Sequence, residues 1–252
     1  MSAIASLRLH AVPPAELQGV WRGNELTRQT QHVIPSGHAG LDSELPGQGW
    51  PQSQLTEILQ AQPGLHEWRL LLPSLGLAIA NGPLVLIGAP HLPNLPALAY
   101  AGIPGDKVLR IDAQTPAERL WAAEQTLRCK ELGALLAWLP QARSEQLRRL
   151  QLASNASQAL AFALRPIQAM HESSPAPLRV SVQAGSALSL SVQILKRRGP
   201  VIDHPVTLTA KLPVMAALRK QRVNTKDHDH AVDRPATPRT ERRSRPSLHV
   251  AA

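Results

Sequence analysis

The chain has 252 residues, 43% of them hydrophobic and 3% aromatic, so it is long enough for one domain with a core of mainly Leu, Ala and Val. Its formal net charge is +9, and the residues from Arg219 onward hold nine Lys and Arg against four Asp and Glu. This excess suits a polyanionic partner such as DNA, although a basic tail can also serve only to keep a protein in solution. A single cysteine excludes an internal disulfide and a cysteine metal cluster.

The predicted elements alternate between strands and helices. Residues 1–32 are a polar leader, and the following apolar runs predict strands at 54–59, 83–88, 107–112, 134–140 and 159–166. Helical spacing predicts helices between these strands, at 66–80, 94–102, 115–132 and 142–158. Two stretches with period-two alternation, 178–185 and 188–199, predict an antiparallel hairpin with one face in water. The fold class is therefore α/β, a mainly parallel sheet flanked by helices with an antiparallel C-terminal edge hairpin.

Two of the predicted helices carry local signals. Thr115 is placed to cap the helix at 115–132, with Pro116 at its first position and Glu118 completing a capping box. Pro73 lies inside the helix predicted at 66–80 and predicts a kink there. We expect the core domain to span 33–212 and the basic segment 213–252 to be disordered.

No run of apolar residues reaches the length of a membrane span, and the N-terminus lacks a signal-peptide core. We therefore expect a cytoplasmic protein without a membrane partner.

The segment before the helix predicted at 66–80 carries a recurring pattern of S/T-G-x-x-x-L-D, a Gly-rich turn and a short strand ending in E-I, in the residues Ser36, Gly37, Leu41, Asp42, Gly47, Gly49, Glu57 and Ile58. In this pattern the segment resembles the RecA-like recombinases, which have it ahead of their phosphate loop. The resemblance implies a RecA-like core with a nucleotide site at the end of that strand.

The nucleotide site itself is degenerate. A phosphate loop counted from Glu57 would need Gly at positions 60 and 65, Lys at 66, and Ser or Thr at 67, whereas the chain has Gln60, Leu65, His66 and Glu67. The glycines let backbone N–H groups surround the phosphates, the lysine neutralises their charge and the hydroxyl holds magnesium.

Two further positions are also altered. Trp138 stands where the strand at 134–140 would place the magnesium-binding Asp, and Pro90 stands near the place of the Glu that activates water. We therefore expect a protein that is not an enzyme and has no cofactor. The pair His228 and His230 gives little support for a metal, and no metal site is expected.

Basic residues are the candidates for contacts with DNA or with an acidic partner. Three of them end the last predicted strand, and the others lie in the tail: Lys196, Arg197 and Arg198, then Arg219, Lys220, Arg222, Arg242, Arg243 and Arg245. A solvated strand end is the alternative reading of the first group. Aromatic residues are absent from these stretches, so base stacking is not supported.

Three groups of residues form a further set of motifs: Trp21, Arg22 and Gly23; Gly37, His38, Leu41, Asp42, Glu44, Leu45, Pro46, Gly47, Gly49, Trp50 and Pro51; and Lys196, Arg197, Arg198 and Gly199. In these motifs the chain, over roughly residues 15–212, is similar to the ImuA family of translesion-synthesis accessory proteins. Gln48 departs from the fuller glycine run of the family.

That similarity implies a non-catalytic part in damage-induced, mutagenic lesion bypass. The implied partners are RecA and an ImuB-type inactive Y-family polymerase, with an error-prone polymerase α-subunit joined indirectly and DNA contacted through the basic tail. The protein would be associated with the nucleoid when induced. The alternative is a SulA-like cell-division inhibitor of the same SOS response that binds FtsZ, because the region 134–166 resembles SulA as well.

Overall fold

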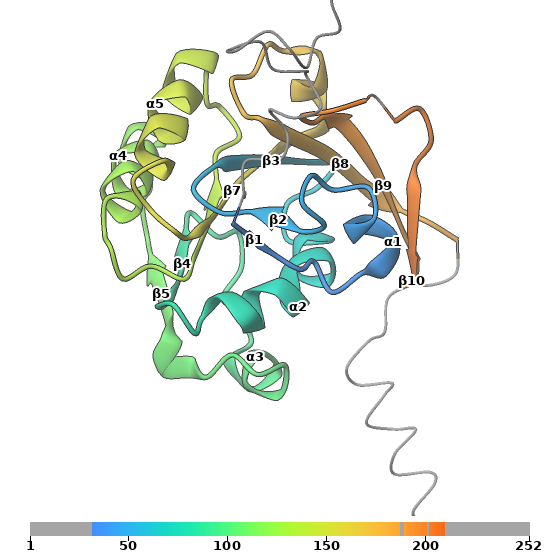
Figure 1. The fold of residues 1–252 in the computed structure, drawn as a ribbon. Coiled ribbons are helices and arrows are strands. Elements are labelled where there is room, and N and C mark those ends of the chain that lie inside the picture. Colours follow the sequence, from blue (N-terminus) through green and yellow to red (C-terminus); the bar gives the residue numbers. More distant parts are fainter. Residues whose placement is uncertain (1–31, 187–188, 201, 210–252) are drawn as a thin grey trace, which may run out of the picture. The chain divides into compact units, whose positions relative to one another are not determined.

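The computed structural model describes residues 32–186, 189–200 and 202–209. At its centre is an eight-stranded sheet in the order β10-β9-β8-β3-β7-β6-β4-β5 (Figure 1). The strands are β3 (Leu55–Gln60), β4 (Leu84–Ile87), β5 (Val108–Ile111), β6 (Ala134–Trp138), β7 (Leu160–Pro166), β8 (Leu178–Ala184), β9 (Ser189–Lys196) and β10 (Val206–Thr209). All pairings from β8 to β5 are parallel, and β9 and β10 are antiparallel to their neighbours. The mainly parallel sheet with an antiparallel edge hairpin is confirmed.

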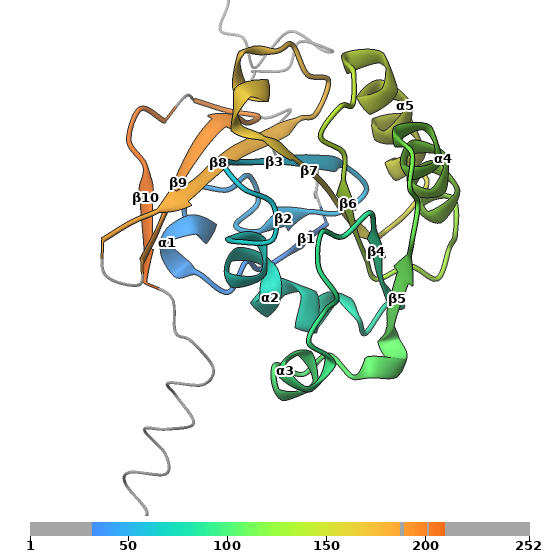
Figure 2. The same cartoon turned by 180° about the vertical axis from the view of Figure 1, so that it is seen from behind.

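Helices cover both faces of the sheet (Figure 2). One face packs against α2 (Glu67–Ala78), α3 (Leu95–Tyr100), the short α1 (Ala39–Asp42) and a two-stranded ribbon of β1 (Val33–Ile34) and β2 (Trp50–Pro51). The other face packs against α4 (Pro116–Leu127) and α5 (Ser144–Ser154). Two 3₁₀ helices, η3 (Gly105–Lys107) and η4 (Ile167–His171), lead into β5 and follow β7. The predicted helices are all present, with shorter ends.

The capping box predicted for α4 is present. The Thr115 hydroxyl accepts a hydrogen bond from the Glu118 backbone N at 3.2 Å, and the Glu118 carboxylate accepts one from the Thr115 backbone N at 3.1 Å. These bonds satisfy N–H groups that the first turn of a helix leaves without partners. Helix α2 continues through Pro73.

The two layers of the core differ in side-chain size. The layer under α2 contains Leu and aromatic residues, including Trp50 and Phe162, whose rings meet edge to face with centroids 5.5 Å apart. The layer under α4 and α5 holds no aromatic residue in the described part of the chain and is rich in alanine: Ala122, Ala123, Ala137, Ala161 and Ala163.

The C-terminal part of the sheet differs from the prediction. The wet face predicted for the hairpin is present only in part. Ser191 and Gln193 on that face of β9 are half-buried, whereas Arg179 and Ser181 on β8 are buried, and Arg179 donates a hydrogen bond to the Ala169 carbonyl in η4. The edge strand β10, the ribbon of β1 and β2, and α1 were not predicted. They are short, and length is part of the sequence signal for an element.

Two motif positions have unusual backbone. Gly37 has φ of +80°, and a Cβ there would lie 2.3 Å from the Cβ of Pro73, so a side chain is excluded by both strain and space. Gln48 has φ of +65° directly after Gly47 at +76°, a region that favours glycine. This explains why a fuller glycine run would suit that turn.

The leader up to residue 31 and the tail 213–252 lie outside the described residues, so their predicted boundaries and the predicted disorder stay predictions.

Candidate functional site

The junction between β3 and α2 is the place where a RecA-like protein has its phosphate loop, and here it holds the carboxylate side chain of Glu67. Glu67 is the first residue of α2 and is fully buried. Its Oε1 accepts a hydrogen bond from the Gly64 backbone N at 2.6 Å, and its Oε2 accepts one from the His66 backbone N at 3.0 Å. Backbone N–H groups at a helix N-terminus are the groups that hold phosphate in nucleotide-binding loops. Here the carboxylate of Glu67 occupies two of them.

Trp138, at the end of β6, completes this arrangement. Its indole Nε1 donates a hydrogen bond to Glu67 Oε1 at 2.9 Å, and the side chain is almost fully buried. An indole offers a donor only and cannot bind a cation through oxygen, as an Asp at this position would. Trp138 Nε1 and Glu67 Oε1 therefore supply each other's hydrogen-bond partner.

His66 stands at the position of the loop lysine. Burial lowers its pKa below the ordinary value of 6.5, and the positive charge of Arg69 lowers it further, against the smaller opposing effect of Glu67. The imidazole is consequently neutral at pH 7 and does not supply the fixed positive charge of a lysine. Its Nδ1 is buried without a hydrogen-bond partner in the described part of the chain.

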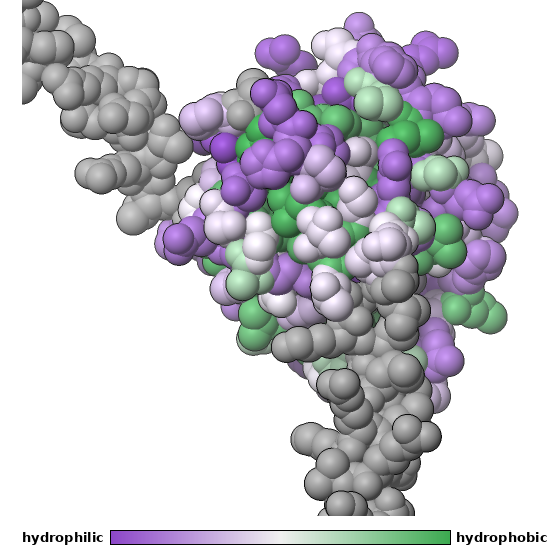
Figure 3. All heavy atoms as spheres, turned by 90° about the vertical axis from the view of Figure 1, so that its right-hand side faces the viewer, coloured by the Kyte–Doolittle hydropathy of each residue, from purple (hydrophilic) through white to green (hydrophobic). Residues whose placement is uncertain are grey.

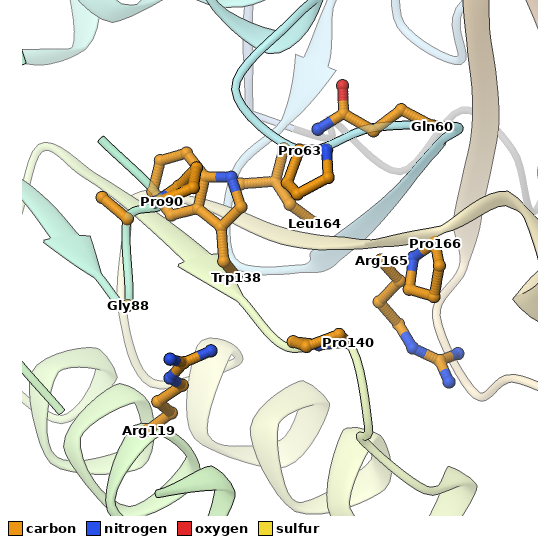
Figure 4. Close-up of a pocket in the computed structure, with 11 residues that line it drawn as sticks. Gln60, Pro63, Gly88, Pro90, Arg119, Trp138, Pro140, Leu164, Arg165 and Pro166 are labelled. Atoms are coloured by element: carbon orange, nitrogen blue, oxygen red, sulfur yellow. The ribbon is translucent and has the colours of Figure 1, made fainter. Parts of the chain in front are cut away.

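A pocket of about 320 Å³ lies at the carboxyl ends of β3, β4, β6 and β7 (Figure 4). It brings together three of the predicted degenerate positions, Gln60, Pro90 and Trp138, while Leu65 is exposed elsewhere. The remaining lining residues are Pro63, Gly88, Ala89, Arg119, Pro140, Leu164, Arg165 and Pro166.

Prolines surround this pocket. Each of the four strands ends at a proline or is followed by one within three residues, namely Pro63, Pro90, Pro140 and Pro166. Proline has no backbone N–H, so these positions cannot donate hydrogen bonds. The carboxyl edge of the sheet therefore offers few backbone N–H donors to a phosphate group at these four positions.

A buried charge cluster lies beside the pocket. Glu57 on β3 accepts hydrogen bonds at 2.6 Å from Arg165 Nη1 on β7 and from Arg179 Nε on β8. Arg165 also donates to the Ala142 carbonyl and to Glu172. Burial opposes the charge of Arg165, but the hydrogen bonds to Glu172 and Glu57 outweigh it and raise its pKa. The cluster fastens β7, β8 and the connection between them to β3.

The basic residues at the end of β9 are partly engaged within the fold. Lys196 donates to the Ser174 carbonyl at 2.8 Å, and Arg197 donates to the carbonyls of Pro200 and Glu44. Arg198 is exposed. Partner contact by these three residues stays a prediction. The tail candidates lie outside the described residues: Arg219, Lys220, Arg222, Arg242, Arg243 and Arg245.

The comparisons with known proteins give one partial likeness. No protein-family model matches the chain. The chain is 28% identical over 101 residues to the cell division inhibitor SulA of Edwardsiella piscicida. The match covers 40% of this chain and 60% of that protein, so it spans less than two thirds of the SulA length.

The surface offers an apolar strand edge. β5 is the last strand of the sheet on its side, and Leu109 and Ile111 on it are exposed. On the side of α1, β9 and β10, hydrophobic side chains show between more numerous hydrophilic ones (Figure 3).

Among the described residues, no helix is long and apolar enough to cross a membrane, and no group of three or more His, Cys, Asp and Glu could hold a metal.

Sequence reasoning identified where the site lies but missed part of its wall. Arg119, Arg165 and the prolines other than Pro90 were not singled out. A signal was present, because a proline follows one predicted strand after another. Arg119 had no such signal, since a basic residue in the first turns of an amphipathic helix is ordinary.

Proposed function

We propose that the chain is a RecA-like protein without nucleotide chemistry, which acts through protein contacts in the bacterial DNA-damage response. The observation that carries the proposal is the Glu67 carboxylate bound to the N–H groups of Gly64 and His66, with Trp138 donating to it. An added phosphate would have to displace a buried, hydrogen-bonded carboxylate of the same sign of charge.

Support for a RecA-like arrangement comes from the order of elements. β3 leads through a short loop into α2, the central strands are parallel, and the Ser36–Asp42 segment precedes them, with the Asp42 carboxylate accepting a hydrogen bond from the Ser36 backbone N at 2.8 Å. Support for a protein-binding role comes from the exposed apolar edge at β5, whose outer side has no partner among the described strands and carries Leu109 and Ile111.

Within the damage response, we assign the chain to mutagenic lesion bypass as a non-catalytic accessory protein. It would link RecA and an ImuB-type inactive Y-family polymerase with an error-prone polymerase α-subunit, in the cytoplasm and near the nucleoid. The basic residues beyond position 218 would hold the complex near DNA. The family motifs at Gly37–Pro51 and at Lys196–Gly199 support this assignment.

The second candidate is a SulA-like cell-division inhibitor that binds FtsZ. The observation in its favour is the partial likeness to the SulA of Edwardsiella piscicida.

A pull-down separates the two candidates. The tagged full chain is expressed at native level in cells of the source organism, DNA is damaged, and bound proteins are identified by mass spectrometry. Recovery of RecA or an inactive Y-family polymerase supports lesion bypass, whereas recovery of FtsZ without these proteins supports division inhibition.

A separate titration tests the absence of nucleotide chemistry. Purified full chain is titrated with a fluorescent ATP analogue in the presence of Mg²⁺, and phosphate release is followed. We expect neither saturable binding at micromolar concentrations nor turnover. Hydrolysis that Glu67→Ala changes would contradict the proposal.

A further inference from the structure

Gln60 presents an unused amide to the pocket. The residue is 2% exposed, and neither Oε1 nor Nε2 has a hydrogen-bond partner within the described ranges. Buried polar groups without partners are costly and uncommon, so this unpaired amide, buried in a residue of the pocket wall, is a candidate partner for a ligand. Its adjacent donor and acceptor match those of a second amide, which can form two parallel hydrogen bonds with it.

Arg119 faces the same space from the opposite side of the Trp138 ring (Figure 4). Its Nε donates to the Ala113 carbonyl at 3.0 Å, which holds the side chain against Gly88, where a Cβ would lie 2.7 Å from that nitrogen. No carboxylate contacts Arg119 in the part of the chain that the structure describes. The two terminal nitrogens of a positioned guanidinium match a carboxylate in a two-pronged contact.

The pocket continues into a furrow over α4. It shares Arg119 and Pro140 with a second hollow of about 210 Å³, and that hollow shares Leu120 with a third of about 260 Å³ between α4 and α5. Trp121, which is 66% exposed, lines the far hollow. The walls of the three hollows are mainly apolar.

We propose that this furrow binds an extended acidic and apolar segment of a partner protein. A backbone amide of the segment pairs with Gln60, and a carboxylate side chain meets Arg119. Apolar side chains fill the hollows beside Trp138 and Trp121. The charge of Arg119 selects an acidic segment. The inference deepens the proposed function and rests on its protein-binding role.

A displayed library of random twelve-residue peptides, selected on the purified full chain, tests the proposal. Fluorescein-labelled copies of the enriched peptide, with its acidic residue intact or changed to the amide, are then titrated by anisotropy. The variants are Arg119→Gln and Gln60→Leu. The matched control is Arg110→Gln, an exposed arginine on β5 that lines none of the three hollows. Circular dichroism melts verify that each variant is folded.

We expect enriched peptides that combine Asp or Glu with apolar residues at a fixed spacing. Arg119→Gln and Gln60→Leu should each raise Kd about tenfold or more, and Arg110→Gln should leave it unchanged. The amide copy of the peptide should bind wild type as weakly as the acidic copy binds Arg119→Gln, with no further loss when both changes are combined.

Enrichment of no sequence, enrichment of basic sequences, or binding that neither Gln60→Leu nor Arg119→Gln weakens would overturn the proposal. The selection contains no damage-response protein, so it can succeed when the pull-down fails. Conversely, RecA or FtsZ can be recovered in the pull-down through another surface when the selection fails, so the two failures are distinguishable.

Discussion

Replacing Glu57 with Gln should be the most destabilising isosteric change in the sheet. Glu57 is fully buried and contacts two guanidinium groups at 2.6 Å, those of Arg165 and Arg179, whose side chains are only 2% and 8% exposed. The change removes one negative charge and leaves both cations buried, with the half-exposed Glu172 as the remaining carboxylate in the cluster. Leaving a buried charge without its partner costs about 3–5 kcal/mol, a large part of the roughly 5–15 kcal/mol that stabilises a domain.

The chain contains a matched control for this prediction. Glu124 also bridges two arginines, Arg128 at 2.6 Å and Arg149 at 2.7 Å, but their side chains are 61% and 69% exposed. Water screens those contacts, so Glu124→Gln should cost about 1 kcal/mol or less. The distances are similar in both cases, and burial is the main difference, because the Glu124 side chain is 13% exposed and its arginines far more, whereas Glu57 is fully buried.

Urea unfolding of the full chain measures the difference. With a slope of about 2 kcal/mol per molar urea, Glu57→Gln should lower the midpoint by about 1.5–2.5 M and Glu124→Gln by less than about 0.5 M. Equal losses for the two variants would refute the reasoning. Replacing Glu57, Arg165 and Arg179 together by Leu, Met and Met should recover most of the loss, because no buried charge then lacks its partner.

Three further outcomes follow from local geometry. Gly37→Ala should lower the free energy of unfolding, measured in urea, by about 2 kcal/mol or more, because the new Cβ would meet Pro73 and φ is positive. Gly102→Ala, with positive φ but nothing within 4 Å, should cost only about 1 kcal/mol. A larger cost at Gly102 than at Gly37 would contradict the steric argument. Thr115→Ala should lose about 1 kcal/mol by removing the capping bond to α4, and a cost below about 0.3 kcal/mol in the same assay would show that the cap is dispensable. Because burial lowers the pKa of His66, the unfolded state binds the proton more readily than the folded state. The contribution of His66 to the free energy of unfolding should therefore be fully present above pH 6.5 and be lost as the pH falls below it. In unfolding measured over a pH series, His66→Asn should weaken the dependence on pH below 6.5.

The arrangement of the sheet followed from the sequence wherever a strand is apolar throughout or a helix is well capped. The runs at β4 and β6 are apolar throughout, and the structure buries them on both faces. The capping residues at Thr115 and Glu118 fixed the start of α4. β10 could not be found in this way, because four residues without a turn signal give no usable period, and its place depends on pairing with β9.

The sequence predicted where the candidate site lies but not which of its side chains contact one another. Counting from Glu57 placed Glu67 in a lost nucleotide site, and the end of the strand at 134–140 placed Trp138 there. In the structure Glu67 begins α2, directly after the loop that follows β3, and Trp138 ends β6. The hydrogen bond between their side chains joins positions 71 residues apart, and no local pattern reports such a contact. The same holds for the position of Arg119 against Gly88, which depends on how α4 lies beside the end of β4.

β3 lies in the middle of the sheet, between two strands that the ribosome synthesises much later. Both neighbours of β3 come late in the sequence, and its ion pairs to Arg165 and Arg179 span 108 and 122 residues. During synthesis on the ribosome, β3 therefore emerges early and waits with both edges unpaired while β4, β5 and β6 can already assemble. Contacts between residues so far apart in sequence favour slow folding. A chain whose synthesis stops before β8 would leave one edge of β3 without a partner strand. We expect full-length synthesis to be the step at which this protein most depends on chaperones.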